Sequence, residues 1–370
     1  MDKKKYKYSD LFDSLSSDII SQTYAFGEYL PTETELCERF GVSRITAQHA
    51  LRLLEQRGYI RRSTKTGSRV IYISPQKRAE HDVVYYVADS STGNRIFFAE
   101  GLSDELNKHG IRLIEKYFDN DEALLKHYVE ECSSKAIGMI LLPTTKFLQS
   151  DYLLQLKKQR FPFVVYDTYP LHPQFSTLAP DRFANVIEAF RYLVQTGHRN
   201  IGYFSLLSKY TGTMNDGRKG FLEATKKYDL PHCKSNIFEI HTDTARRFQS
   251  NTRMLLAKHV LSNLNGMTAI ICGNDHLAHY LLAYARQLVI DVPKDLSVIG
   301  HDDYFQPDTP SYLPLTTIRH PFRKAGVYCA KILLSKLQGN SDIQINATIP
   351  GELIIRETTR KLTPAKVRLE

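Results

Sequence analysis

The segment from Leu30 to Val70 restricts the fold more than any other part of the chain, because it carries the start and stop signals of two short helices. Thr32, with Glu35 three positions later, predicts a capping box, in which each side chain bonds the backbone N–H of the other residue. Gly41 is typical of the residue that ends a helix with a positive φ. Ser43 is then expected to cap a further helix.

The patterns on either side complete a small domain. Apolar residues recur with helical spacing between Tyr8 and Gln22, which predicts a first helix. Gly58 is expected to end the third helix, and Tyr59–Ile60 and Val70–Ile73 have the composition of two short strands. The sequence therefore predicts a winged helix-turn-helix over residues 1–73, in which the strand pair forms the wing.

Positive charge is concentrated in this part of the chain. The formal net charge is +9, and the segment 39–78 holds ten basic residues against one acid, Glu55, so the other residues together are close to neutral. A localised basic surface on such a motif favours contact with DNA, and a solvated basic face is the alternative. The ten residues are Arg39, Arg44, Arg52, Arg57, Arg61, Arg62, Lys65, Arg69, Lys77 and Arg78.

The start of the third helix carries the candidate DNA-reading side chains. In a helix-turn-helix, this part of the second helix of the motif enters the major groove. Arg44 can bind guanine O6 and N7, Gln48 can bind adenine N6 and N7, and Thr46 is exposed beside them. Thr34 and Ser43 are placed where hydroxyls contact phosphate. A surface salt bridge for Arg44 and a solvated position for Gln48 are the alternatives.

The wing supplies a second candidate contact. Lys65 and Gly67 lie at its tip, where positive charge and a bare backbone suit phosphates or the minor groove. The motifs LP-T-E-x-E-L, F-G-V-S-R-x-T and A-L-x-x-L-x-x-x-G-Y-I over residues 6–73 resemble the winged helix-turn-helix of the GntR family. The resemblance implies DNA contacts by Thr34, Ser43, Arg44, Thr46 and the wing from Lys65 to Gly67. The chain departs from the family pattern at Gln48, where arginine is frequent, and in the wing, which has one glycine instead of two.

The rest of the chain has a different pattern. Apolar strands alternate with amphipathic helices, which predicts an α/β fold with parallel doubly wound sheets, and about 260 residues of this pattern suggest two lobes. The polar segment 74–81 is expected to be a linker. We expect the effector-binding and dimerisation domain to cover 82–370, with one lobe at about 82–195 and 322–348 and the other at about 196–321 and 349–360.

Polar residues follow several predicted strands. Asn274 and Asp302 each come directly after an apolar strand, and ligands of such folds bind beyond the carboxyl ends of the strands. Carboxylates, amides and aromatic rings together suit a sugar. The alternative is that Asp and Asn end strands simply as turn formers.

A second resemblance concerns this larger part. The motifs QTGHRNIGY, RKGFLEA, ICGNDHLAHYLL, VPKDLSVIGHDD and LTTIRHP, over roughly residues 82–360, resemble the lac- and galactose-repressor sensor domain, whose fold is that of periplasmic sugar-binding proteins. A GntR-type DNA-binding domain joined to this sensor domain resembles the arabinose-responsive repressors. This resemblance implies that the effector is a pentose or a related sugar. The effector contacts implied by the matching motifs are Phe97, Phe98, Asp181, Arg218, Asn274 and Asp302.

Other function classes find little support in the sequence. The five cysteines lack metal-ligand spacing, His276 with His279 finds no third ligand at an obvious spacing, and the P-loop and nucleophile-elbow motifs are absent. We therefore expect no metal, no cofactor and no enzymatic activity. The apolar runs are too short for a membrane span and the charged N-terminus does not resemble a secretory signal, which favours the cytoplasm.

The hypothesis from sequence is a sugar-responsive transcription repressor. As a homodimer it would read a pseudo-palindromic DNA operator, because a two-fold protein matches two half-sites. The alternative is a sugar-binding or enzymatic α/β protein whose basic head serves protein contacts.

Overall fold

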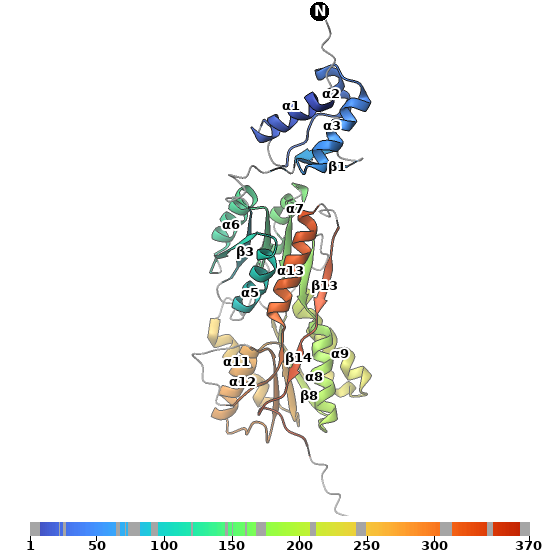
Figure 1. Cartoon of the computed structure of the whole chain (residues 1–370). Coiled ribbons are helices and arrows are strands. Elements are labelled where there is room, and N and C mark those ends of the chain that lie inside the picture. The colour runs from blue at the N-terminus through green and yellow to red at the C-terminus, as the bar shows by residue number, and fades with distance from the viewer. Residues whose placement is uncertain are drawn as a thin grey trace, which may run out of the picture. The chain divides into compact units, whose positions relative to one another are not determined.

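The computed structural model (Figure 1) consists of two compact units, Met1–Asp82 and Val83–Glu370. It describes residues 8–21, 23–24, 27–63, 67–70, 72, 82–89, 95–119, 121–144, 147–149, 151–159, 161–167, 175–207, 212–241, 249–303, 313–338 and 343–362.

The first unit contains three helices around a small apolar core. They are α1 (Tyr8–Ile20), α2 (Glu33–Phe40) and α3 (Arg44–Gln56). Leu11 and Leu15 of α1 are fully buried against the inward face of α3, where Leu51 and Leu54 lie at helical spacing. This burial fixes which face of α3 points outward, because the apolar stripe must face the core.

The wing is a two-stranded antiparallel hairpin. Strand β1 (Ile60–Ser63) pairs with β2 (Gly67–Val70), with Ile60 opposite Val70. Tyr29 forms an isolated bridge to Arg69, and the Nε atom of Arg69 donates to the carbonyl of Gly27 at 2.8 Å. The segment before α2 is therefore tied to the wing.

The first lobe of the second unit is a six-stranded parallel sheet in the order β13-β7-β6-β5-β3-β4. Helices α5 and α13 pack on one face, and α6 and α7 on the other. The strands are β3 (Val83–Ala88), β4 (Arg112–Tyr117), β5 (Gly138–Leu141), β6 (Phe163–Tyr166), β7 (Thr177–Pro180) and β13 (Asn346–Ile349). The helices are α5 (Arg95–Asn107), α6 (Glu122–Lys135), the 3-10 turn η1 (Phe147–Gln149), α7 (Asp151–Lys158) and α13 (Phe322–Leu337).

The second lobe repeats this architecture with one difference. Its sheet has the order β14-β12-β11-β10-β8-β9, in which only the pairing of β14 with β12 is antiparallel among the described strands. The strands are β8 (Ile201–Leu207), β9 (Ile237–His241), β10 (Ala269–Cys272), β11 (Ser297–Asp302), β12 (Thr316–Arg319) and β14 (Glu352–Ile354). The helices are α8 (Arg182–Gln195), α9 (Gly212–Lys227), the 3-10 segment η2 (Pro231–Asn236), α11 (Gln249–Ser262) and α12 (Asp275–Gln287). The α/β class predicted from sequence, with two parallel-dominated sheets, is confirmed.

The chain passes between the lobes after β7, after β12 and after β13. Helix α8 belongs to the second lobe, because its Val186 and Phe190 share a core with Ile201 of β8 and Phe221 of α9. The first chain segment of the first lobe therefore ends at Pro180, and not at about residue 195 as expected from sequence. The amphipathic pattern of α8 shows that one face is buried but does not say against which sheet.

Two glycines allow α5 and α13 to touch backbone to backbone. A Cβ on Gly101 would lie 2.0 Å from the carbonyl oxygen of Arg323, and a Cβ on Gly326 would lie 2.1 Å from that of Phe98. The close approach of the two helices therefore requires a glycine on each of them. This close packing ties the late helix α13 into the core of the first lobe.

Candidate functional site

Local hydrogen bonds set the start of the recognition helix α3. Thr32 and Glu35 form the predicted capping box of α2, with the Thr32 N–H donating to Glu35 Oε2 at 2.7 Å. Gly41 ends α2 with a φ of 62°, and Ser43 caps α3 by accepting from the N–H of Thr46 at 3.2 Å. All three predicted caps are confirmed, so the sequence alone determines where α3 begins.

The Glu33 carboxylate accepts hydrogen bonds from three side chains near the start of α3. It accepts from Arg44 Nε at 3.1 Å, from Gln48 Nε2 at 2.9 Å and from Arg62 Nη2 at 2.8 Å. The hydrogen bond from Gln48 and the two guanidinium groups lower the pKa of Glu33, against the opposing effect of burial. Glu33 thereby neutralises part of the basic surface and fixes the side-chain directions of Arg44 and Gln48.

The residues predicted to contact DNA differ in their exposure. Thr34, Ser43 and Arg44 are exposed, and Thr46 and Gln48 are half-buried. Gly67 is exposed and has a φ of 87°, which disfavours other residues. Lys65 lies outside the described residues. The salt bridge considered for Arg44 is present, and its guanidinium side chain nevertheless stays 78% exposed.

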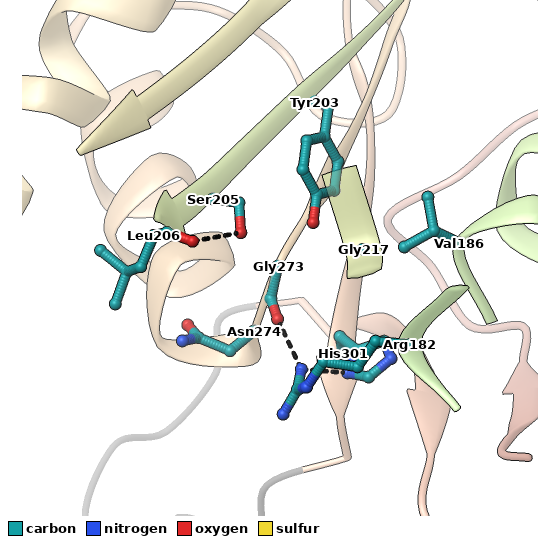
Figure 2. Close-up of a pocket in the computed structure, with 9 residues that line it drawn as sticks. All are labelled: Arg182, Val186, Tyr203, Ser205, Leu206, Gly217, Gly273, Asn274 and His301. Atoms are coloured by element: carbon teal, nitrogen blue, oxygen red, sulfur yellow. Dashed lines mark hydrogen bonds between the residues drawn. The ribbon is translucent and has the colours of Figure 1, made fainter. Parts of the chain in front are cut away.

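A cavity lies at the carboxyl edge of the second sheet (Figure 2). Figure 2 shows Arg182 from α8 beside Gly273 and His301, with Ser205 and Asn274 on the other side. The lining residues are Arg182, Val186, Tyr203, Ser205, Leu206, Gly217, Gly273, Asn274 and His301. Residues 208–211 and 304–312 lie outside the described part of the chain.

Arg182 is the central group of this site. Its Nη1 atom donates to the carbonyl of Gly273 at 3.0 Å and lies 2.9 Å from His301 Nδ1, and its Nη2 atom donates to Asp302 Oδ1 at 3.2 Å. Asp167, at the end of β6 in the first lobe, lies 4.0 Å away. Arg182 thus interacts with carboxylates from both lobes.

Burial and Arg182 together decide the charge states here. Burial, together with the nearby guanidinium of Arg182, lowers the pKa of His301 to about 3. Burial alone would raise the pKa of Asp302, but Arg182 above all, together with His320, holds it well below its usual value. A guanidinium can only donate, so the contact with His301 requires a lone pair on Nδ1. Near neutral pH the site therefore contains a neutral imidazole, a guanidinium and a carboxylate.

His301, Asp302 and His320 also form a group of metal-ligating type. One ligand atom from each of the three residues lies within 4.8 Å of the other two. Among the described residues, these three form the one group with such spacing. Two observations disfavour a cation. The Arg182 guanidinium lies within 3.2 Å of two of the three ligand atoms, and His320 Nε2 is already 3.2 Å from Asp302 Oδ1. The group fits a hydrogen-bonded network better than a metal site.

The six effector contacts implied by resemblance have different environments. Asn274 lines the cavity, and Asp302 bonds the cavity residue Arg182. Asp181 caps α8 by accepting from the N–H of Ala184 at 3.0 Å, and Arg218 pairs with Glu239 at 3.1 Å. Phe97 is 47% exposed, whereas Phe98 is buried in the core of the first lobe and stacks on Tyr166.

The site residues selected from the sequence did not include Arg182, His301, His320 or Glu33. The signals were weak but present. Arg182 directly follows Asp181, which the motif comparison singled out, and His301 directly precedes Asp302. Glu33 lies inside the L-P-T-E motif but is an acid in a basic segment, so charge counting gave no reason to select it.

Comparisons with known proteins agree with this domain arrangement. Residues 7–70 match the family of bacterial regulatory proteins called the gntR family, and residues 190–359 match the periplasmic binding protein-like domain. The chain joins a GntR-type DNA-binding domain to a periplasmic-binding-protein-like domain. The resemblance predicted from sequence is thereby confirmed for both parts.

Similar proteins are transcription regulators and not enzymes. An arabinose metabolism transcriptional repressor of Geobacillus stearothermophilus is 28% identical over 366 residues, which cover 96% of this chain and 98% of that protein. A transcriptional regulator CelR–cellobiose complex has a TM-score of 0.64 at 17% identity, covering 89% of this chain and 100% of that one. A LacI family transcriptional regulator of Enterococcus faecium with bound ribose has a TM-score of 0.60 at 22% identity, covering 76% of this chain and 100% of that one. The enzymatic alternative therefore finds no support in these relatives.

Proposed function

We propose that this chain is a sugar-controlled repressor of carbohydrate-utilisation genes that binds a pseudo-palindromic operator as a homodimer. The observation that carries the proposal is the combination of two sites in one chain. One is a helix-turn-helix in which Ser43 and Arg44 lie exposed at the start of α3. The other is a cavity rich in hydrogen-bonding groups, at the carboxyl ends of the parallel strands in the second lobe.

On the DNA side, the proposed contacts combine base readers and phosphate binders. Arg44 and Gln48 would read base edges in the major groove, while hydroxyls and the wing would hold the backbone. The phosphate contacts are assigned to Thr34, Ser43, Thr46, Lys65 and Gly67. Because Arg44 and Gln48 share Glu33 in the free protein, their binding to bases requires an exchange of hydrogen-bond partners.

On the sensor side, the proposed ligand is a small sugar, with a pentose as the first choice. Asn274, Ser205, Arg182 and Asp302 offer both donors and acceptors, as vicinal hydroxyls require. Tyr203 lines the cavity with a ring that is buried and stacked on Phe221, so its hydroxyl is the group that can serve a ligand. The arabinose repressor and the regulators with bound ribose and cellobiose support a sugar for this fold.

The control mechanism follows from the position of the site. A sugar that binds the closed form of the two lobes more tightly than the open form shifts the chain toward closure. In the homodimer this shift would change the spacing of the two DNA-binding units, so that they no longer match the operator half-sites. The proposed direction is release of DNA by the sugar.

We also propose the cytoplasm as the site of action, where operator DNA and imported sugars meet. Each helix that the structure describes is too short or too polar to cross a bilayer.

The test uses the purified full-length chain and fragments of the promoter regions of its own genome. Gel shifts at low ionic strength should show a specific complex, with affinity that falls steeply as salt is added. A thermal-shift panel of pentoses, hexoses, their acids and their phosphates should then identify a sugar that also releases the complex. Absence of any specific complex would refute the proposal, and a complex that ignores every stabilising sugar would refute control by the cavity.

A further inference from the structure

Ile45 is an apolar side chain on the outward face of the recognition helix. It is the second residue of α3 and is 79% exposed, whereas the inward residues Ala47, Ala50 and Leu51 are at most 1% exposed. Ile45 therefore contributes nothing to the core of the first unit. A single exposed apolar residue is common on protein surfaces, so the surroundings of Ile45 must decide whether it has a role.

Those surroundings are polar and cationic. Arg44 precedes Ile45, and Gln48, His49 and Arg52 follow it at the spacings that share one helix face. Arg44, His49 and Arg52 are exposed, and Gln48 is half-buried. The helix N-terminus adds partial positive charge at the same end. A basic face with one isoleucine in it is complementary to a polyanion that displays a single apolar group.

Duplex DNA meets this description at one base. In the major groove, the 5-methyl group of thymine is the apolar group that distinguishes the base pairs, and apolar side chains contact it. We propose that Ile45 reads this methyl group at one T·A pair in each operator half-site, next to the position read by Arg44. The inference rests on the proposed function, namely that the first unit binds duplex DNA.

The expected contribution is small but measurable. Removing one buried methyl group costs about fourfold in affinity, so two symmetric half-sites would lose about fifteenfold together. This is less than the loss expected from a bidentate arginine contact. Ile45 would therefore adjust sequence preference without determining whether DNA is bound.

Uracil substitution isolates this contact, because uracil differs from thymine only by the missing methyl group. Starting from a selected operator, each thymine is replaced in turn by uracil and the affinity of the full-length chain is measured. We expect a loss of about fourfold at one position in each half-site. The Ile45→Ala variant should lose about fifteenfold on the unmodified operator, because both half-sites of the homodimer lose the contact. It should also be insensitive to uracil at that position, because the two changes remove the same contact.

The matched control is Ile20→Ala, which removes an exposed isoleucine from the end of α1 in the same unit. It should leave the uracil sensitivity unchanged, and the thermal stability of both variants should equal that of the parent chain. If the parent is insensitive to uracil at every position, or if Ile45→Ala keeps the full sensitivity, Ile45 does not read thymine although the chain binds DNA. If the parent binds no duplex at all, the proposed function itself fails.

Discussion

The guanidinium of Arg182 lies 3.2 Å from the carboxylate of Asp302, although 120 positions separate the two residues. Arg182 is the first residue of α8, directly after the passage from the first lobe, and Asp302 is the last residue of β11 in the second. The carboxylate of Asp167 in the first lobe is 4.0 Å from the same guanidinium. Arg182 therefore stands where closure of the lobes would change its distance to Asp167, whereas Asp302 moves with it in the second lobe.

Replacement of Arg182 should be costly for stability. Arg182→Ala leaves the Asp302 carboxylate buried without its guanidinium partner, and we expect a loss of about 3 kcal/mol in the free energy of unfolding. Urea denaturation measures this change. Arg191→Ala is the matched control on the same helix, because Arg191 and Glu188 form an exposed pair that should contribute less than about 1 kcal/mol. Equal losses in the two variants would contradict a central role for Arg182.

Replacement of Asp302 tests the sensor separately from the DNA-binding unit. Asp302→Asn keeps the volume of the side chain but removes the charge and one acceptor, so we expect the sugar response to be lost while the sugar-free chain still binds its operator. Gel shifts with and without the sugar give both quantities. Asp104→Asn, at an exposed ion pair with Arg323, should behave as the parent chain does. Retained release of DNA by the Asp302 variant would remove this carboxylate from the effector site.

Substitutions of Arg44 and of its partner Glu33 should change the affinity for DNA in opposite directions. Arg44→Ala should weaken operator binding by about 1–3 kcal/mol and relax the preference at one base pair, without a change in sugar affinity. Glu33→Gln removes a negative charge that holds Arg44 and Arg62, so binding to unrelated DNA should become stronger while discrimination for the operator decreases. Competition gel shifts with operator and unrelated duplexes measure both effects. A Glu33 variant with unchanged discrimination would show that this carboxylate does not orient the reading side chains.

The buried imidazole of His301 predicts a dependence of stability on pH. Because burial lowers its pKa to about 3, the unfolded chain binds the proton more readily between about pH 6.5 and pH 3. The stabilisation is thus fully present above pH 6.5 and is lost as the pH falls toward 3, by about 2 kcal/mol between pH 6.5 and pH 5. Urea midpoints at these two values should show a smaller difference for His301→Gln than for the parent. The lowered pKa of His198 acts in the same direction in both proteins, so parallel curves would contradict the assignment to His301.

The sequence predicted best what depends on neighbouring residues. The caps at Thr32, Gly41 and Ser43 require only groups a few positions away, and these give the start of α3 and the direction of its outward face. The alternation of strands and helices likewise follows from local periodicity, since each element must bury one face. The selection of Asn274 followed from the position of strand ends in such sheets.

What the sequence could not supply depends on partners far along the chain. The role of Arg182 requires the passage from β7 to α8 and three contacts more than 90 positions away. Phe98 was selected by its motif. Its burial against Tyr166 depends on how α5 packs on α13, where Gly326 approaches the backbone of Phe98. The lobe assignment of α8 was wrong for the same reason, because an amphipathic pattern does not name the sheet that it covers.

The late return of α13 to the first lobe has a consequence for biosynthesis. Its first residue, Phe322, follows the first residue of β3, Val83, by 239 positions, and the core of that lobe contains residues of both elements. At about 5–20 residues per second the ribosome needs about 12–48 s to make this stretch. During that interval the nascent lobe displays the apolar surface that α13 later covers, while the amino-terminal unit already has all of its own core residues. Chaperones that bind nascent chains should therefore be recruited to the sensor and not to the DNA-binding unit.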